Sequence, residues 1–294
     1  MRRAFILLGL VPVVASAQKL DPVFYVDLRP TFTSTRGGTN EFHWYDRDAR
    51  PSVVGVRLNL QNGNQIHLSQ RLERIENTGD VDSLDEYTLE RRGEWKLGKQ
   101  YLTFGAGGLV RDSAPALSVQ THVVFDRLPA TIAIAEAGPG RARGLFARVG
   151  RDTGVSVAVG EHLANQPTSL STIRNPEDAP GRDHGYGLIL GIDARQQMGA
   201  FSVVGEFASF QQGQDTSDVD TQVSDLRATW RAAKTSRSAE ISLLFGWSRD
   251  WQSREDFYRI SADVQVDRHF IVSPYVRFNR GALAQVGLSS RIRF

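Results

Sequence analysis

The sequence predicts an all-β fold, a transmembrane antiparallel β-barrel of about 16 strands, with 14 or 12 strands as the alternatives. Three observations predict it. Past an apolar N-terminal stretch, apolar and polar residues alternate almost to the last residue, as in strands that have one apolar face. Short turns alternate with longer polar loops, as they do when the two ends of a barrel lie on opposite sides of a membrane. Aromatic residues gather near the ends of the apolar faces, where the membrane interfaces would lie.

The N-terminal stretch has the pattern of an export signal. Arg2 and Arg3 precede an apolar core at residues 4–14, and Ala15-Ser16-Ala17 forms a small-residue cleavage pattern. The apolar run is too short for a membrane-spanning helix, which needs about 20 such residues. We therefore expect residues 1–17 to be a signal peptide that is removed, and residues 18–294 to form the barrel.

Composition excludes several other classes of protein. Without Arg2 and Arg3 the 35 basic residues fall to 33, which equals the number of Asp and Glu residues. The mature chain is then formally neutral, so the pI of about 9.0 is no argument for nucleic acid as a partner. The absence of cysteine excludes disulfides, thiolate zinc sites and cysteine nucleophiles. A mean hydropathy of -0.31 with one long apolar run excludes a helical membrane protein.

The predicted strands are clearest in the second half of the chain. In the last one, Val286, Leu288, Ile292 and Phe294 share an apolar face, and the residues between them are mostly polar. The same alternation gives earlier strands at residues 188–194, 201–207, 226–230, 239–247, 258–266 and 270–278. Each strand therefore has one face suited to lipid and one suited to water.

The first half of the chain follows the same rule, with weaker alternation in its middle. The segment Gln61-Asn62-Gly63-Asn64 predicts a tight hairpin turn, because Asn-Gly readily adopts the positive φ that such turns require. The expected strands are residues 24–32, 54–60, 66–72, 85–92, 95–104, 118–126, 130–137, 144–150 and 155–160. The expected long loops are residues 33–51, 75–84, 105–117, 161–185, 211–221 and 249–256.

The C-terminal segment resembles a known assembly signal. Residues 284–294 form an alternating strand that ends in an aromatic residue. They resemble the C-terminal insertion signal of Gram-negative outer-membrane β-barrels, which the barrel-assembly machinery recognises, with Val286, Leu288, Ile292 and Phe294 as its apolar positions. This resemblance implies an outer-membrane location, with outer-membrane lipid and the barrel-assembly machinery as partners.

A second, shorter motif is similar to porin-like proteins. Gly98-Lys99-Gln100 followed by Phe104-Gly105 looks like the Gly-Arg/Lys-Gln strand signature of several porin-like families, including alginate-export-type channels. The motif covers about eight residues and matches no single family closely. It favours a channel over other kinds of barrel and implies neither a substrate nor binding residues.

The candidate pore-lining residues are charged residues on the polar faces of the predicted strands. They are Arg29, Arg57, Arg71, Arg148, Arg227, Arg259, Arg277, Arg291, Asp27, Glu73, Glu206, Asp225, Glu240 and Asp263. Because the two signs nearly balance, we expect many of them to pair along the wall and to leave weak or mildly anionic selectivity. A bore of about 16 strands is too wide for side chains to fill, so the expected function is passive diffusion of small hydrophilic solutes through a porin-like channel.

Two alternative functions stay open at this stage. One is a non-conducting barrel with a structural or adhesion role, or a barrel plugged by residues 105–117 or 161–185. The other is an outer-membrane hydrolase, which we do not expect, because the six histidines form no metal-binding pair and His162 lies in a polar loop. We accordingly predict no enzymatic activity, cofactor or bound metal.

Some features do not decide between these functions. The acidic clusters at residues 80–86 and 215–220 lack the Gly and the bidentate Glu of a dedicated calcium loop, so we expect solvated loops. Residues 41–46 are rich in aromatic side chains that could bind a ligand, although we expect them to extend a strand. The transported solute is not encoded in any motif, and a homo-oligomer is compatible with the sequence.

Overall fold

The computed structural model describes residues 21–46, 50–60, 63–73, 84–110, 113–124, 127–135, 143–161, 163, 186–212, 220–232 and 240–294. The predicted signal peptide and most of both acidic clusters lie outside these residues. No helix in the described part of the chain is long and apolar enough to cross a membrane.

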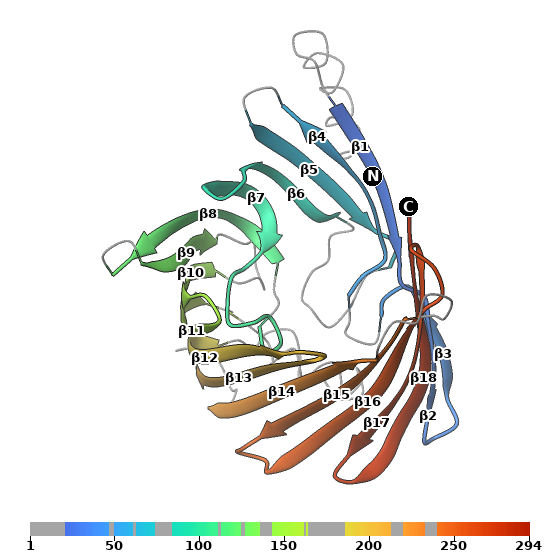
Figure 1. Ribbon diagram of the computed structural model, residues 1–294. Helices are drawn as coiled ribbons and strands as arrows, with labels where there is room; N and C mark the ends of the chain where they lie inside the picture. The colour runs from blue at the N-terminus through green and yellow to red at the C-terminus, as the bar shows by residue number, and fades with distance from the viewer. Residues whose placement is uncertain are drawn as a thin grey trace.

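The described residues are arranged almost entirely as antiparallel strands. The strands are β1 (Asp21–Leu28), β2 (Thr31–Thr35), β3 (Asn40–His43), β4 (Val53–Asn59), β5 (Asn64–Arg71), β6 (Leu84–Arg91), β7 (Trp95–Tyr101), β8 (Ser113–Val123), β9 (Leu128–Ala135), β10 (Arg143–Gly150), β11 (Thr153–Glu161), β12 (Tyr186–Met198), β13 (Phe201–Gln212), β14 (Thr221–Arg231), β15 (Glu240–Asp250), β16 (Glu255–Gln265), β17 (Phe270–Asn279) and β18 (Ala282–Arg293). From β4 onward each strand pairs with the next one in the chain, and together they form the ring in Figure 1.

Two pairs of short strands each make one strand of the barrel. β18 pairs with both β1 and β2, so β1 and β2 are one strand interrupted at Arg29 and Pro30. β3 pairs with β2 and β4 pairs with β1, so β3 and β4 form the neighbouring strand. The 18 segments therefore make a closed antiparallel barrel of 16 strands, which confirms the predicted fold class.

The connections alternate in length as the sequence predicted. Tight turns occur at the end of the barrel that holds both termini, and Gly63 and Gly93 in two of them have φ values of +80° and +78°. At the other end, β17 and β18 are joined by a short turn in which Arg280 and Gly281 both have positive φ. Several strand boundaries differ from the prediction; among them, β3 lies inside the expected loop 33–51, β7 ends at Tyr101, and β8 begins at Ser113.

These differences have physical causes. Leu102 and Phe104 alternate with Thr103 in sequence, but they are out of phase with the outward-facing Leu97 of β7, and both side chains are buried inside the barrel. The start of β8, Ser113-Ala114-Pro115-Ala116, has small residues and little hydrophobic contrast, so its pairing with β7 was not visible as alternation.

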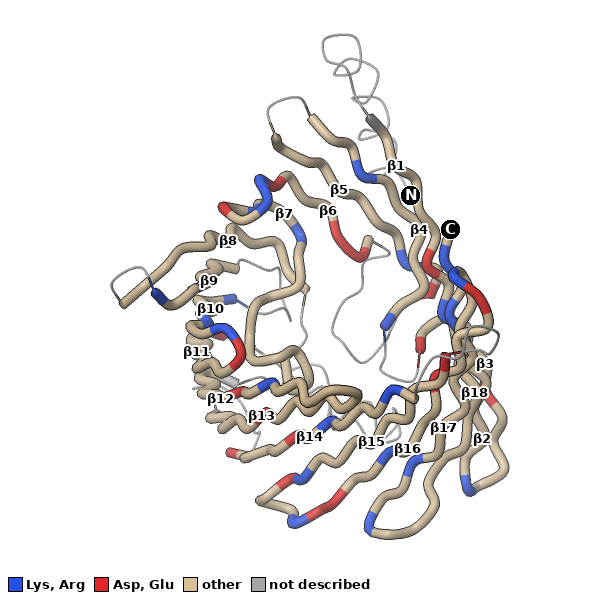
Figure 2. Tube along the Cα trace, in the orientation of Figure 1, with Lys and Arg blue, Asp and Glu red and all other residues tan. Residues whose placement is uncertain are grey.

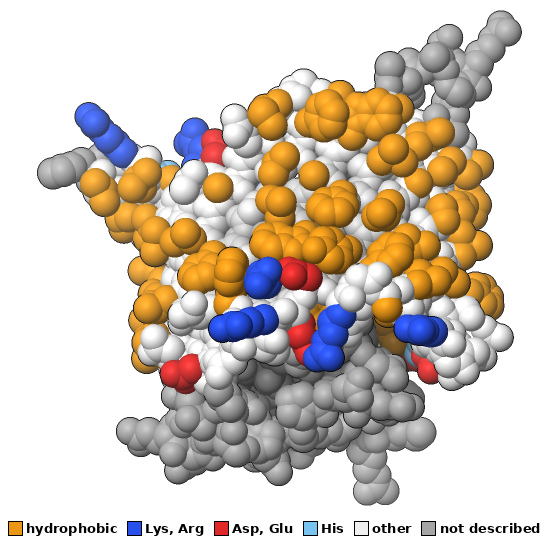
Figure 3. All heavy atoms as spheres, turned by 90° about the horizontal axis from the view of Figure 1, so that it is seen from below, with side chains coloured by type: hydrophobic (Ala, Val, Ile, Leu, Met, Phe, Trp, Pro, Cys, Tyr) orange, Lys and Arg blue, Asp and Glu red, His pale blue; other side chains and the backbone are white. Residues whose placement is uncertain are grey.

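The two faces of the wall differ in the expected way. Leu243, Ile260 and Leu288, which the sequence assigned to lipid, are 46%, 52% and 47% exposed on the outer surface. Figure 3 shows a broad apolar surface with charged side chains along its lower edge. Residues at the alternate positions, such as Asp225 and Arg277, are buried, so the inner face of the wall is the polar one.

Candidate functional site: the barrel interior

The segment between β7 and β8 folds into the barrel. Figure 1 shows it leaving β7 and running inside the ring toward β12 to β14. The amide of Gly105 donates a hydrogen bond to Ser156 Oγ of β11 at 2.9 Å, and Arg195 of β12 donates to the carbonyl of Ala106 at 3.2 Å. We call residues 102–110 the inner loop. It overlaps residues 105–117, which the alternative of a plugged barrel would fold inward, but residues 113–117 belong to β8.

Glu206 of β13 binds the tip of the inner loop. Its carboxylate accepts hydrogen bonds from the amides of Gly108 at 2.8 Å and Leu109 at 3.3 Å. The same carboxylate forms an ion pair with Arg227 of β14, which also lies 2.7 Å from Asp225. The Glu206 side chain is only 1% exposed, so one buried acidic residue accepts from two backbone donors and pairs with a partly exposed guanidinium.

An apolar layer lies beneath the inner loop. Phe104 and Leu109 are 2% and 1% exposed. They belong to a buried cluster that also contains Leu102, Val110, Ala114, Ala116, Ala133, Ala135, Phe146, Ala158, Leu163, Ile189, Ala208, Phe210, Val223 and Phe257. Several of these apolar residues stand on the inner face of the wall, where the alternation of apolar and polar residues predicts polar side chains. The loop is therefore attached by apolar packing as well as by hydrogen bonds.

Glycines let the inner loop approach the wall. Gly105 and Gly107 have φ values of +52° and +77°, which L side chains rarely adopt. A Cβ atom on Gly108 would lie 2.4 Å from Nη2 of Arg227, and one on Gly191 of the wall would lie 2.7 Å from the Phe104 ring. Sequence reasoning missed this role, although Gly-Ala-Gly-Gly between two apolar residues was the available signal.

A cluster of three arginines and two acids joins the first and last strands. Asp27 lies 3.0 Å from Arg29, 2.5 Å from Arg291 and 3.4 Å from Arg293. Arg29 also pairs with Asp46, a residue of the segment between β3 and β4 that the sequence placed in a loop. We call these five residues the seam cluster. It carries one more basic than acidic residue.

Other charged residues that the sequence proposes for the pore lining form ion pairs with residues of other strands. Arg71 lies 2.7 Å from Asp85. Arg148 binds Asp193 through two hydrogen bonds of 3.0 and 2.6 Å. Figure 2 shows basic and acidic residues distributed around the ring rather than separated into two halves.

The contacts of the remaining candidates include neutral, aromatic and histidine side chains. Arg57 lies over the ring of Tyr25, and Arg277 donates to Gln285 at 2.8 Å and lies over Tyr275. Glu73 accepts a hydrogen bond from the Trp44 amide and lies near His43. Asp263 accepts from Ser273 at 2.7 Å, while Glu240 and Arg259 stand at inner positions opposite Gln265 and Gly246.

A hydrogen-bonded pair of side chains, Tyr25 and His67, was not predicted from the sequence. The Tyr25 hydroxyl and His67 Nε2 lie 2.5 Å apart, and His67 Nδ1 lies 3.9 Å from Glu86. No group of three metal-binding side chains occurs among the residues that the structure describes.

Comparison with solved structures identifies the architecture. OmpT of Vibrio cholerae, an in-vitro folded outer membrane protein in its trimer form, superposes with a TM-score of 0.60 at 9% identity over 94% of this chain and 99% of that chain. An anion-selective porin from Comamonas acidovorans has a TM-score of 0.53 at 12% identity, covering 94% of this chain and 100% of its own. This is the porin fold.

Other porin structures give the same result. A mutant of the Rh. blastica porin has a TM-score of 0.55 at 10% identity, covering 93% of this chain and 100% of its own. Searches of protein families and of curated proteins find no match to the sequence. At such low identity the likeness establishes the porin fold and leaves function to be argued from the interior.

Proposed function

We propose that this protein is an outer-membrane channel through which small hydrophilic solutes diffuse passively. The observation that carries the proposal is the polar interior of a barrel of 16 strands, a size that leaves a bore which side chains of the wall do not fill. The hydrogen bonds of the inner loop reach β11, β12 and β13, so the loop is held against one side of the wall. It narrows the bore in the manner of a constriction.

The interior charges support weak or mildly anionic selectivity. Arg71 with Asp85 and Arg148 with Asp193 neutralise each other locally, which reduces the field in the bore. The seam cluster has one more basic than acidic residue, whereas Arg227 lies between the two acids Glu206 and Asp225, so these groups nearly balance and favour weak selectivity. The other candidate pore-lining residues also make contacts with neighbouring side chains of the wall, as described for the barrel interior.

Export and assembly belong to the same proposal. Residues 1–17 act as the signal peptide, and the barrel-assembly machinery recognises the last strand. In the structure, Val286, Leu288 and Phe294 of that segment are 39%, 47% and 73% exposed on the outer face, where another protein can contact them. Neither catalysis nor a cofactor is part of this proposal, and a homo-oligomer stays a prediction.

Single-channel recording in a planar bilayer tests the function. Folded protein is expected to give steady conductance, and the reversal potential in a salt gradient should lie near zero or indicate mild anion preference. Electrical silence from protein that is folded by circular dichroism and gel mobility would instead favour a structural or adhesion role. Strong cation selectivity would contradict the assignment of the inner charges.

A further inference from the structure

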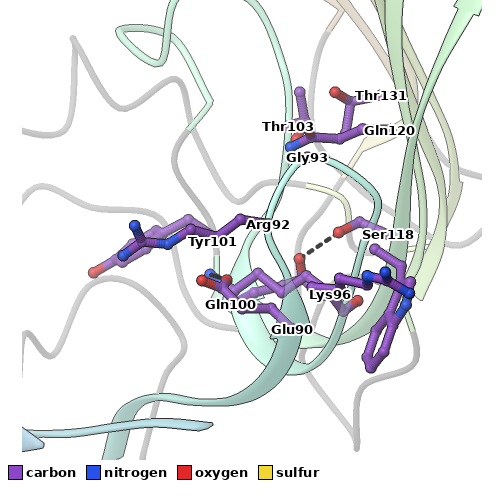
Figure 4. Close-up of a pocket in the computed structure, with 12 residues that line it drawn as sticks. Glu90, Arg92, Gly93, Lys96, Gln100, Tyr101, Thr103, Ser118, Gln120 and Thr131 are labelled. Atoms are coloured by element: carbon purple, nitrogen blue, oxygen red, sulfur yellow. Dashed lines mark hydrogen bonds and ion pairs between the residues drawn. The ribbon is translucent and has the colours of Figure 1, made fainter. Parts of the chain in front are cut away.

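A recess of about 320 Å³ opens on the inner wall at β6 to β9 (Figure 4). Lys96, Gln100, Ser118, Gln120 and Thr131, which line it, occupy inner positions on three neighbouring strands. The first residues of the inner loop border the recess through Thr103, whereas the hydrogen bonds of the loop tip lie on β11 to β13. The volume of the recess lies near the lower limit of small-molecule sites, which suits one sugar ring better than an oligosaccharide.

The floor of the recess is rigid. The amide nitrogen of Gln100 donates to the carbonyls of Lys96 at 3.0 Å and Ala116 at 2.9 Å, and its oxygen accepts from Ser118 at 2.7 Å. Figure 4 shows the Gln100 and Ser118 side chains meeting in this way. Because these groups are already positioned, a ligand would lose little free energy to ordering of the wall.

The sides of the recess offer both donors and acceptors. The side chains of Gln120 and Thr131 make no hydrogen bond to another residue in the described ranges. An amide and a hydroxyl can each donate and accept, which matches the hydroxyl groups of a polyol. Tyr101 and Trp95 also line the recess and supply aromatic surface.

The charges of the recess favour a neutral ligand. Lys96 Nζ lies 2.9 Å from Glu86 and 3.9 Å from Glu90, so its charge is compensated within the wall. An anion would compete with these glutamates for the ammonium group, and a cation would be repelled by it. Arg92, at the edge, donates to Gln65 at 3.3 Å.

We propose that this recess is a resting site for a neutral polyhydroxylated solute the size of one sugar ring. The proposal rests on the channel function and deepens it, because it names a class of solute that pauses on the wall during passage. Gln120 and Thr131 bind the solute hydroxyls, while Gln100 and Ser118 hold the shape of the site.

Equilibrium binding tests the site without requiring conductance. Folded protein in detergent is titrated with D-glucose, and the intrinsic tryptophan fluorescence is followed, with Trp95→Phe identifying the reporting residue. Gln120→Leu and Thr131→Val should each weaken binding about five-fold, the effect of one lost hydrogen bond. Gln265→Leu and Thr229→Val change the same residue types at inner positions outside the recess and should leave binding unchanged.

Current recording separates this proposal from the function on which it rests. In bilayers, glucose should reduce the ion current of the wild type and of both control variants more than that of Gln120→Leu or Thr131→Val. A conducting protein whose current and fluorescence respond equally in all variants overturns the site and leaves the channel intact. A silent protein that still shows variant-dependent binding supports the site and overturns the channel.

Discussion

Replacing Glu206 with alanine should loosen the inner loop without releasing it. The substitution removes the acceptor of the Gly108 and Leu109 amides and one partner of Arg227. Hydrogen bonds to a charged group contribute about 1.5–3 kcal/mol each, and water entering the lumen will replace part of this, so we expect a loss of about 3 kcal/mol. The ratio of displaced to docked loop then rises by roughly two orders of magnitude.

The apolar layer should still keep the loop docked most of the time. Burial of a large apolar side chain contributes about 1.5–3 kcal/mol, and both Phe104 and Leu109 are almost completely buried. Glu206→Ala should therefore add brief fluctuations to the open-channel current. Glu206→Ala combined with Phe104→Ala should raise the mean conductance, because both attachments are weakened.

Single-channel recording of Glu206→Ala and of the double variant tests these expected changes in conductance. Glu240→Gln is the control, because it changes an acid on the inner face that makes none of the described contacts with the inner loop. The control should conduct as the wild type does. Steady, unchanged conductance in the folded double variant would refute the assignment of residues 102–110 as a constriction held by Glu206.

Three further predictions address the wall. Leu243→Arg, on the outer face of β15, should destabilise the barrel by about 2–4 kcal/mol in denaturant unfolding, whereas Leu244→Arg on the inner face should have little effect; equal losses would contradict the face assignment. Asp193→Asn breaks a buried pair and should cost about 3 kcal/mol of unfolding free energy, while Glu161→Gln, in an exposed pair, should cost less than about 1 kcal/mol. Phe294→Ser should reduce assembly in cells but not folding in detergent, and heat-modifiable gel mobility measures both. Phe24→Ser, at the same end of the barrel, should assemble as the wild type does. Equal assembly of the two variants in cells would argue against the C-terminal signal.

The strands and their faces could be predicted because lipid imposes period-two alternation on every spanning strand. Leu58, Leu243 and Leu288 alternate with polar residues, and all three stand on the outer face. Leu244 shows the limit of the rule. It interrupts the alternation and stands on the inner face, since its neighbours in the chain fix its direction.

The inner loop could not be predicted, because the direction of a loop depends on surfaces that the fold assembles. Phe210 and Val223 lie on two different strands and form an apolar patch only when β13 and β14 pair. Their positions on an otherwise polar face were the available sign that something covers them. Asp46 was missed for a similar reason: its partner Arg29 belongs to another strand, and the pairing depends on the interruption of β1 and β2.

The seam cluster has a consequence for the order of folding. Asp27 and Arg291 are separated by 264 positions in the chain, so their ion pair can form only when the first and last strands meet. Contacts of such long sequence separation form slowly, because the closure of a large loop of chain precedes any favourable contact. The pairs of Asp27 with Arg291 and Arg293 therefore stabilise only the final step, in which an open and curved sheet becomes a closed cylinder. Before that step, Asp27 and Arg29 stand at one unpaired edge and Arg291 and Arg293 at the other, where their charge keeps each edge soluble and opposes pairing with the wrong chain.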